Sequence, residues 1–302
     1  MHSLNISVKM TMTKLSNHHT ACLGCAQIVA ARLVIDQLGP NTIVVNATGC
    51  LEVTTTTYPH SAWQVPWIHS LFANAAPIGS GIDAALDYLT INNKKKSIPR
   101  PTVLVQGGDG ATFDIGFGAL TASWSRGDNL LYICYDNEGY ANTGMQASLS
   151  TPSLAQASMK TSSRYNKYLN KRDMIAIALA HKVPYIAQTN IAFPLDLKEK
   201  IAKAQTIKGP RYIQILVPCI PGWKIKLSDQ MTIARLASET GLYPLLEFTE
   251  GQLTKKMAVP KPTPPVKEYI RNQGRYSHLL NNDTDLKIFQ NMADDNIKKY
   301  NL

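Results

Sequence analysis

The chain has too few cysteines for a disulfide scaffold and no apolar run long enough to cross a membrane. Five cysteines occur in 302 residues, whereas small domains held together by disulfides are much denser in cysteine. No stretch approaches the roughly 18 continuous apolar residues of a membrane helix. Charged residues account for only 17% of the chain and hydrophobic residues for 44%. This composition excludes an intrinsically disordered chain and predicts a globular protein.

The first twenty residues lack acidic side chains, arginine and an apolar core of signal-peptide length. We therefore interpret residues 1–18 as a short polar arm and expect a cytoplasmic protein. The chain as a whole carries a formal charge of +10. This excess suits an acidic partner, but it does not say whether that partner is protein, lipid or nucleic acid.

Five short runs rich in β-branched residues predict buried strands. Each run is apolar throughout, as expected of parallel strands covered on both faces. Because helical patterns separate the runs, the sequence predicts an α/β fold with an open, mostly parallel sheet and helices on both faces. Ligands bind at the carboxyl ends of the strands in such sheets. The predicted strands are Thr42–Asn46, Thr102–Gln106, Leu130–Tyr135, Pro184–Gln188 and Tyr212–Val217, and the predicted helices are Ala26–Gln37, Pro77–Leu89, Ile115–Ser125, Arg172–His181, Pro194–Gln205 and Gln230–Glu239.

A proline cluster divides the chain near its carboxyl end. Pro260, Pro262, Pro264 and Pro265 lie within six residues, which is typical of an extended linker. The residues beyond it are polar and mixed in charge, so we expect a short helix and a tail that packs against something else, for example another chain. The sequence therefore predicts a main domain at 19–257 and a linker with a tail at 258–302.

A glycine-rich loop, Gly107-Gly108-Asp109-Gly110, follows the second predicted strand. Glycine lets the backbone approach a ligand closely, and the helix after the loop points free amides at an anion. Asn137 follows the next strand, 28 residues after Asp109. An aspartate and an amide oxygen at neighbouring strand ends could share one magnesium ion and so neutralise a diphosphate. The alternative is that this loop is an ordinary turn and that the later Asn-Thr-Gly caps a helix.

Four of the five cysteines follow or precede predicted elements, where their side chains can converge. Cys22 and Cys25 form a C-x-x-C before a helix, Cys50 follows the first strand and Cys219 follows the last. Four thiolates suit zinc or an iron–sulfur cluster, a C-x-x-C can also be a redox pair, and scattered thiols that bind nothing remain an alternative. Cys134 lies inside an apolar run and is interpreted as a core residue.

The two patterns together favour a cluster over zinc. An Asn some 26 to 28 residues after Gly-Asp-Gly resembles the magnesium–diphosphate motif of thiamine diphosphate enzymes. Thiamine holds a strongly reducing carbanion after a 2-oxo acid loses carbon dioxide. An iron–sulfur cluster would carry its electrons away one at a time, whereas zinc has no redox chemistry.

From about His19 to Leu280 the chain resembles the beta, thiamine-binding subunits of pyruvate:ferredoxin oxidoreductases. The segments that carry the resemblance are HHTACLGCAQ, NATGCLEVTTTTYP, WQVPWIHSLFANAAPIGSGI, GGDGATFDIGFGAL, YDNEGYANTGMQAS and VPCIPGW. It implies a thiamine diphosphate-binding fold and the reversible conversion of pyruvate and coenzyme A to acetyl-CoA, carbon dioxide and reduced ferredoxin. A relative for another 2-oxo acid, such as oxalate or a branched-chain acid, is the alternative.

The resemblance also implies roles for particular residues. Magnesium would be held by Asp109, Asn137 and the carbonyl of Gly139, and catalytic Asn142 would lie close to the reacting carbon. In relatives a glutamate often stands where this chain has Gln27, which can donate a hydrogen bond but carries no charge. A 4Fe–4S cluster would be bound by Cys22, Cys25, Cys50 and Cys219, and thiamine diphosphate would be contacted by Gln27, Cys50, Gly108, Asp109, Gly110, Ala111, Asn137, Gly139, Tyr140 and Asn142.

Partner chains follow from the same resemblance. An alpha subunit would supply the pyrimidine-binding half with its catalytic glutamate, and gamma and delta subunits would carry coenzyme A-related and ferredoxin-like parts. The acceptor would be an acidic ferredoxin or flavodoxin, which Lys94–Lys96 could help to steer.

Glu52 is either a base or, as we favour, a structural residue near the cluster. A zinc-bearing nucleic-acid-binding protein would explain the charge and the cysteines, but no aromatic–basic repeat supports it.

Overall fold

An eight-stranded sheet forms the centre of the protein. The computed structural model describes residues 13–92, 99–157 and 171–302. Most of the predicted arm and the Lys94–Lys96 run lie outside the described residues. Among the helices of the described ranges, none is long and apolar enough to cross a bilayer.

The strands lie in the order β2-β1-β3-β4-β6-β5-β7-β8. From β2 to β5 in this order neighbouring strands run parallel, and β7 and β8 are added antiparallel at one edge. The predicted open, mostly parallel sheet is thus confirmed. The bounds are β1 (Thr42–Ala47), β2 (Trp67–Ser70), β3 (Thr102–Gly108), β4 (Leu130–Asp136), β5 (Tyr185–Asn190), β6 (Arg211–Leu216), β7 (Leu246–Thr249) and β8 (Gln252–Lys256).

All five predicted strands are present, as β1, β3, β4, β5 and β6, whereas β2, β7 and β8 were not predicted from the sequence. β2 is a partly exposed edge strand of four residues. β8 reads QLTKK and is exposed along its whole length, so no apolar run marks it. β7 and β8 are held in place by pairing on β5 and on one another, which local sequence does not reveal.

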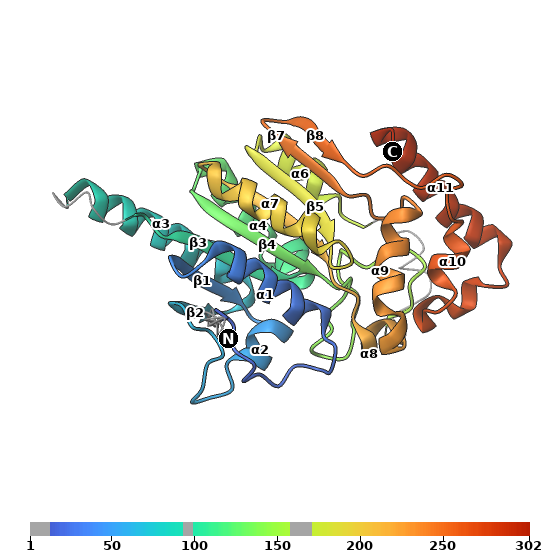
Figure 1. Cartoon of the computed structure of the whole chain (residues 1–302), viewed down its shortest axis with the longest axis horizontal. Helices are drawn as coiled ribbons and strands as arrows, with labels where there is room; N and C mark the ends of the chain where they lie inside the picture. The colour runs from blue at the N-terminus through green and yellow to red at the C-terminus, as the bar shows by residue number, and fades with distance from the viewer. Residues whose placement is uncertain (1–12, 93–98, 158–170) are drawn as a thin grey trace, which may run out of the picture.

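Helices cover both faces of the sheet, as predicted (Figure 1). On one face lie α1 (Ala26–Leu38) and α7 (Pro194–Thr206), where Ala30, Val34 and Leu38 give α1 an apolar stripe at helical spacing. On the other face lie α3 (Ala75–Asn92), α4 (Phe117–Arg126) and α6 (Met174–Ala180). Shorter helical segments are α2 (Cys50–Thr55), η1 (Phe72–Asn74), the π-helical turn η2 (Gly110–Ile115) and η3 (Leu227–Asp229).

The remaining helices form a group beside one end of the sheet (Figure 1). A third core cluster joins Trp223, Ile233, Tyr276 and Phe289 from four of them. The segment after the prolines therefore packs against its own chain and contains an 18-residue helix as well as the short one expected. The division at residue 258 stays a prediction. These elements are α8 (Ile220–Trp223), α9 (Gln230–Glu239), α10 (Val266–Ile270), η4 (Gly274–Leu279) and α11 (Asp283–Tyr300).

Candidate functional site

Four loops meet at the carboxyl edge of the sheet, because β1, β3, β4 and β6 are consecutive neighbours in it. The register pairs Gly108 at the end of β3 with Tyr135, and Asp136 at the end of β4 with Leu216. Residues directly after these strands must therefore lie side by side. These residues include Cys50, Asp109, Asn137 and Cys219.

A small pocket of about 50 Å³ lies between the loops. All ten residues predicted to contact the diphosphate cofactor line it, together with five that the sequence did not single out, among them Phe72 and Thr48. Thr48 lies directly after β1, so its position at a strand end was the available signal. The lining residues are Gln27, Thr48, Gly49, Cys50, Phe72, Gly108, Asp109, Gly110, Ala111, Asn137, Gly139, Tyr140, Ala141, Asn142 and Thr143.

Three groups that can bind a metal ion converge at one side of this pocket. The amide nitrogen of Asn137 donates hydrogen bonds to Oδ1 of Asp109 at 3.1 Å and to the carbonyl oxygen of Gly139 at 2.7 Å. Turning the amide over would direct the Asn137 oxygen toward the same point as the other two oxygens. A hard divalent cation takes such oxygen ligands, so the predicted magnesium set fits the arrangement.

Asp109 is 1% exposed, and its surroundings disfavour the ionised carboxylate. Burial, and then the nearby charge of Asp136, raise the pKa of Asp109 well above its usual value. The hydroxyl of Ser148 donates a hydrogen bond to Oδ2 of Asp109 and acts in the opposite direction. A bound cation would favour the ionised form in the same way and more strongly. Ser148 was also missed from the sequence, since nothing in its spacing relates it to β3.

Close packing between the loops after β3 and β4 leaves no room for a side chain at Gly110. A Cβ there would lie 2.3 Å from the ring of Tyr140. Tyr140 in turn donates its hydroxyl to Oδ2 of Asp114 at 2.8 Å. The loops after β3 and β4 are thus fitted to one another at side-chain distance.

The four predicted cluster cysteines line a second cavity of about 180 Å³. Burial, and then the charge of Cys219, raise the pKa of Cys50 to about 12, and burial also raises the pKa of Cys219 to about 11. Thiolates at these positions would need a cationic group to stabilise them. Five residues line both this cavity and the small pocket: Gln27, Cys50, Asn137, Ala141 and Asn142. Cys134 is fully buried in the sheet core, as predicted.

Within the described residues, no group of three or more His, Cys, Asp or Glu side chains is arranged to hold a metal ion. Four thiols are a donor set that suits zinc or an iron–sulfur cluster. The 4Fe–4S cluster therefore stays a prediction.

The side chain of Glu52 contacts neighbouring side chains and lines neither of the two cavities. Its Oε1 accepts a hydrogen bond from Thr56 at 3.2 Å and lies 3.6 Å from Nδ1 of His69. Nε2 of His69 in turn lies 2.9 Å from the hydroxyl of Thr48, which lines the small pocket. These contacts agree with a structural role for Glu52.

Comparison with known proteins gives a consistent result. A family model described as "Thiamine pyrophosphate enzyme, C-terminal TPP binding domain" matches residues 47–215. The chain is 43% identical to pyruvate synthase subunit PorB of Methanosarcina barkeri over 96% of this chain and 97% of that protein. It is 44% identical to the PorB subunit of Methanocaldococcus jannaschii, over 93% and 94% of the two chains. It is also 38% identical to ketoisovalerate oxidoreductase subunit VorB of Pyrococcus abyssi, over 89% and 86%.

A solved structure supports the fold. It is that of a 2-oxoglutarate:ferredoxin oxidoreductase from Magnetococcus marinus, with a TM-score of 0.56 and 22% identity over 76% of this chain and 82% of that one. At this identity the likeness concerns the fold alone. Together with the family model it confirms the expected thiamine diphosphate-binding architecture.

Proposed function

This chain belongs to the PorB family of pyruvate synthase subunits, a group of oxidoreductase subunits, and we propose that it is the beta subunit of a pyruvate:ferredoxin oxidoreductase. The reaction is the reversible oxidative decarboxylation of pyruvate with coenzyme A to acetyl-CoA and carbon dioxide. The observation that carries the proposal is the common wall of the two cavities, in which Gln27 and Cys50 face both. Such a wall would place a redox group directly beside the cofactor.

The small pocket would hold the diphosphate end of the cofactor. Asp109, the Asn137 side chain and the Gly139 carbonyl would bind magnesium through their oxygens, with the Asn137 amide turned so that its oxygen faces the ion. Gly108, Gly110 and Ala111 would leave room for the phosphate oxygens close to the backbone. Thiamine diphosphate, when bound, supplies the electron sink that stabilises a carbanion.

The neighbouring cavity would hold a 4Fe–4S cluster on Cys22, Cys25, Cys50 and Cys219. A cluster accepts and releases single electrons, as transfer to a ferredoxin or flavodoxin requires. Gln27, the second residue of helix α1, lies between the two groups and can donate a hydrogen bond without adding charge. Asn142 lines both cavities, and its amide would orient groups on the cofactor side.

The site on this chain is only part of a complete one. A pocket of about 50 Å³ is well below the roughly 300 Å³ at which ligand pockets usually begin. This supports a site completed by an alpha subunit that supplies the pyrimidine-binding half and its glutamate. Further gamma and delta subunits would complete the enzyme, and this chain would be inactive alone.

A branched-chain 2-oxo acid is the second candidate substrate. The VorB relative is named for ketoisovalerate and is 38% identical, within the 37–44% range of the PorB relatives. Because the two highest of these identities are to PorB chains, we expect kcat/KM to be higher for pyruvate than for 2-oxoisovalerate or oxalate in the assembled enzyme. A higher value for either competitor would reassign the substrate and leave the family unchanged.

Purification of the intact complex without oxygen tests the function directly. We expect iron, acid-labile sulfide and thiamine diphosphate to co-purify, and pyruvate to reduce ferredoxin only when coenzyme A is present. A colourless preparation that carries zinc and no iron would contradict the proposal, because the electrons would then have no acceptor in this chain.

A further inference from the structure

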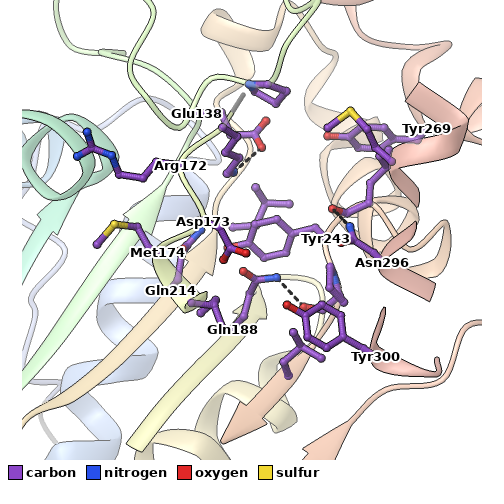
Figure 2. Close-up of a pocket in the computed structure, with 18 of the residues that line it drawn as sticks. Glu138, Arg172, Asp173, Met174, Gln188, Gln214, Tyr243, Tyr269, Asn296 and Tyr300 are labelled. Atoms are coloured by element: carbon purple, nitrogen blue, oxygen red, sulfur yellow. Dashed lines mark hydrogen bonds and ion pairs between the residues drawn. The ribbon is translucent and has the colours of Figure 1, made fainter. Parts of the chain in front are cut away.

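The loop Asn137–Gly139 separates the small pocket from a larger cavity of about 210 Å³. Asn137 and Gly139 line the small pocket, whereas Glu138 between them lines the larger cavity. Figure 2 shows the Glu138 carboxylate at this cavity, with Tyr243 and Tyr269 from distant parts of the chain around it. Glu138 has a φ of 62°, in the left-handed region that residues other than glycine seldom adopt. Tertiary contacts must therefore stabilise this backbone conformation of Glu138.

A partly exposed lysine and a buried arginine hold the Glu138 carboxylate. Nζ of Lys171 lies 2.9 Å from Oε1 of Glu138 and 2.8 Å from Oδ2 of Asp136. Nη1 of Arg275 lies 2.8 Å from Oε2 of Glu138, as an ion pair rather than a directed hydrogen bond. The side chains of Glu138 and Arg275 are 5% and 1% exposed. Each charge therefore depends on the other in a site where an unpaired charge is very costly.

Arg275 reaches the same loop by a second route. Its guanidinium lies 3.4 Å from the ring centroid of Trp223, and Nε1 of Trp223 donates a hydrogen bond of 2.7 Å to the carbonyl of Asn137. Trp223 ends α8, the short helix that follows Cys219. Arg275 therefore supports both the side chain of Glu138 and, through Trp223, the peptide of Asn137.

We propose that Arg275, from the carboxyl-terminal segment, is a positioning residue that holds Asn137 and Gly139 in the geometry that binds the divalent cation. Buried ion networks are weak sources of stability, so a network around a strained loop is better explained by the geometry it imposes. The sequence predicts a linker and a tail at residues 258–302 and predicts no site residue among them. This inference rests on the proposed magnesium site. It states that a residue of the carboxyl-terminal segment fixes the geometry of the magnesium ligands.

The test uses the assembled complex, stripped of cofactor and titrated with Mg²⁺ at a fixed concentration of thiamine diphosphate. Cofactor binding is followed by equilibrium dialysis. For Arg275→Met we expect the half-saturating Mg²⁺ concentration to rise about ten- to a hundredfold, as is usual when a partner behind a metal ligand is lost. At saturating Mg²⁺, kcat should return close to the unsubstituted value, and the iron content and visible spectrum should not change.

Arg211→Met is the matched control. Arg211 is a buried arginine at the first residue of β6, the end opposite Cys219, where it donates to Asn129 and to the Ile207 carbonyl. Its loss should lower thermal stability and leave the Mg²⁺ requirement unchanged.

Because Arg275→Met removes a fully buried charge, Glu138→Gln provides a milder second variant of the same pair. The double variant should need no more Mg²⁺ than the weaker-binding single variant, since both changes remove one interaction.

Failure of the role proposed for Arg275 can be distinguished from failure of the proposed magnesium site. If Glu138→Gln and Arg275→Met lower the melting temperature and leave half-saturating Mg²⁺ unchanged, Arg275 is merely structural and the inference is wrong. If the unsubstituted complex itself binds thiamine diphosphate without any dependence on Mg²⁺, the proposed magnesium site fails first.

Discussion

Asp109 is a carboxylate whose position is unfavourable until a cation arrives. It is buried beside Asp136, and both effects raise its pKa. A carboxyl group whose pKa is raised in the folded state contributes stability at low pH and loses that contribution as the pH rises through the folded-state pKa. Ionisation of Asp109 therefore destabilises the folded protein when no cation is bound. A function that requires the negative charge explains why an aspartate is kept here.

We predict that Asp109→Asn abolishes Mg²⁺-dependent binding of thiamine diphosphate without lowering the stability of the cofactor-free protein at pH 7. The amide keeps the size of the carboxyl group and removes the buried charge. The measurement is the melting temperature with and without Mg²⁺ and thiamine diphosphate: the increase seen in the unsubstituted protein should vanish. Iron content serves as the control and should be unchanged. A cofactor-induced increase that survives the substitution would remove Asp109 from the ligand set.

The cysteines allow a second test at single positions. Cys50→Ser should damage the cluster while the fold survives, because Cys50 lies at the wall between the two cavities. Cys134→Ala is the matched control, since Cys134 is fully buried in β4 and lines neither cavity. It should cost about 1 kcal/mol of stability for the small volume removed and leave the iron unchanged. Iron analysis and the visible spectrum check both, and an unaltered spectrum in Cys50→Ser would contradict the assignment.

At the scale of elements, the site is produced by strand order. Chemistry-bearing residues follow β1, β3, β4 and β6, and the sheet makes these four strands neighbours. The loops must then interlock, and the contact between Gly110 and Tyr140 is the tightest point of that fit, because a Cβ there would lie 2.3 Å from the ring.

Gly110→Ala should therefore weaken thiamine diphosphate binding, because the new methyl group must displace Tyr140 or the start of η2. Gly118→Ala in the adjoining helix α4 is the control: a Cβ at Gly118 has nothing within 4 Å, so the change should stabilise the helix by about 0.5 to 1 kcal/mol. Dissociation constants for the cofactor and melting temperatures measure both effects. Equal cofactor binding by the two variants would show that the loops tolerate separation here.

The strands that carry the site were predictable because each is an apolar run buried on both faces, and a turn or a chemistry-bearing residue follows it. TVLVQ before Gly107 and LLYICY before Asp136 are examples. β8 was not predictable, because a fully exposed strand needs no apolar residues. Ser148 was missed for a related reason: its contact with Asp109 spans 39 residues and depends on how a loop folds back. Spacing along the chain predicts which residues lie together at the ends of adjacent strands. It does not predict contacts made by a loop that folds back.

At the scale of the whole molecule, the carboxyl-terminal segment is part of the core. Residues of α10, η4 and α11 share the third core cluster with Trp223 of α8 and Ile233 of α9. The sequence predicted a tail because polar residues dominate its composition, and composition does not reveal that the few apolar ones lie on one face. Phe289 and Ala293 are four residues apart on α11 and are 2% and 0% exposed.

Phe289→Ala should destabilise the whole chain and not merely release its last helix. The ring is packed against Tyr276 at a centroid distance of 5.2 Å, so its loss should lower the free energy of unfolding by about 3 to 5 kcal/mol. Ile288→Ala, at a neighbouring position that is 41% exposed, should cost less than about 1 kcal/mol. Urea unfolding followed by tryptophan fluorescence and by circular dichroism should give coincident single transitions in both variants, because the core is continuous through Trp223. Separate transitions, with the sheet unfolding at the unsubstituted midpoint, would instead mean that residues 258–302 form an independent unit, and Arg275 could not then fix the geometry of the metal-binding loop.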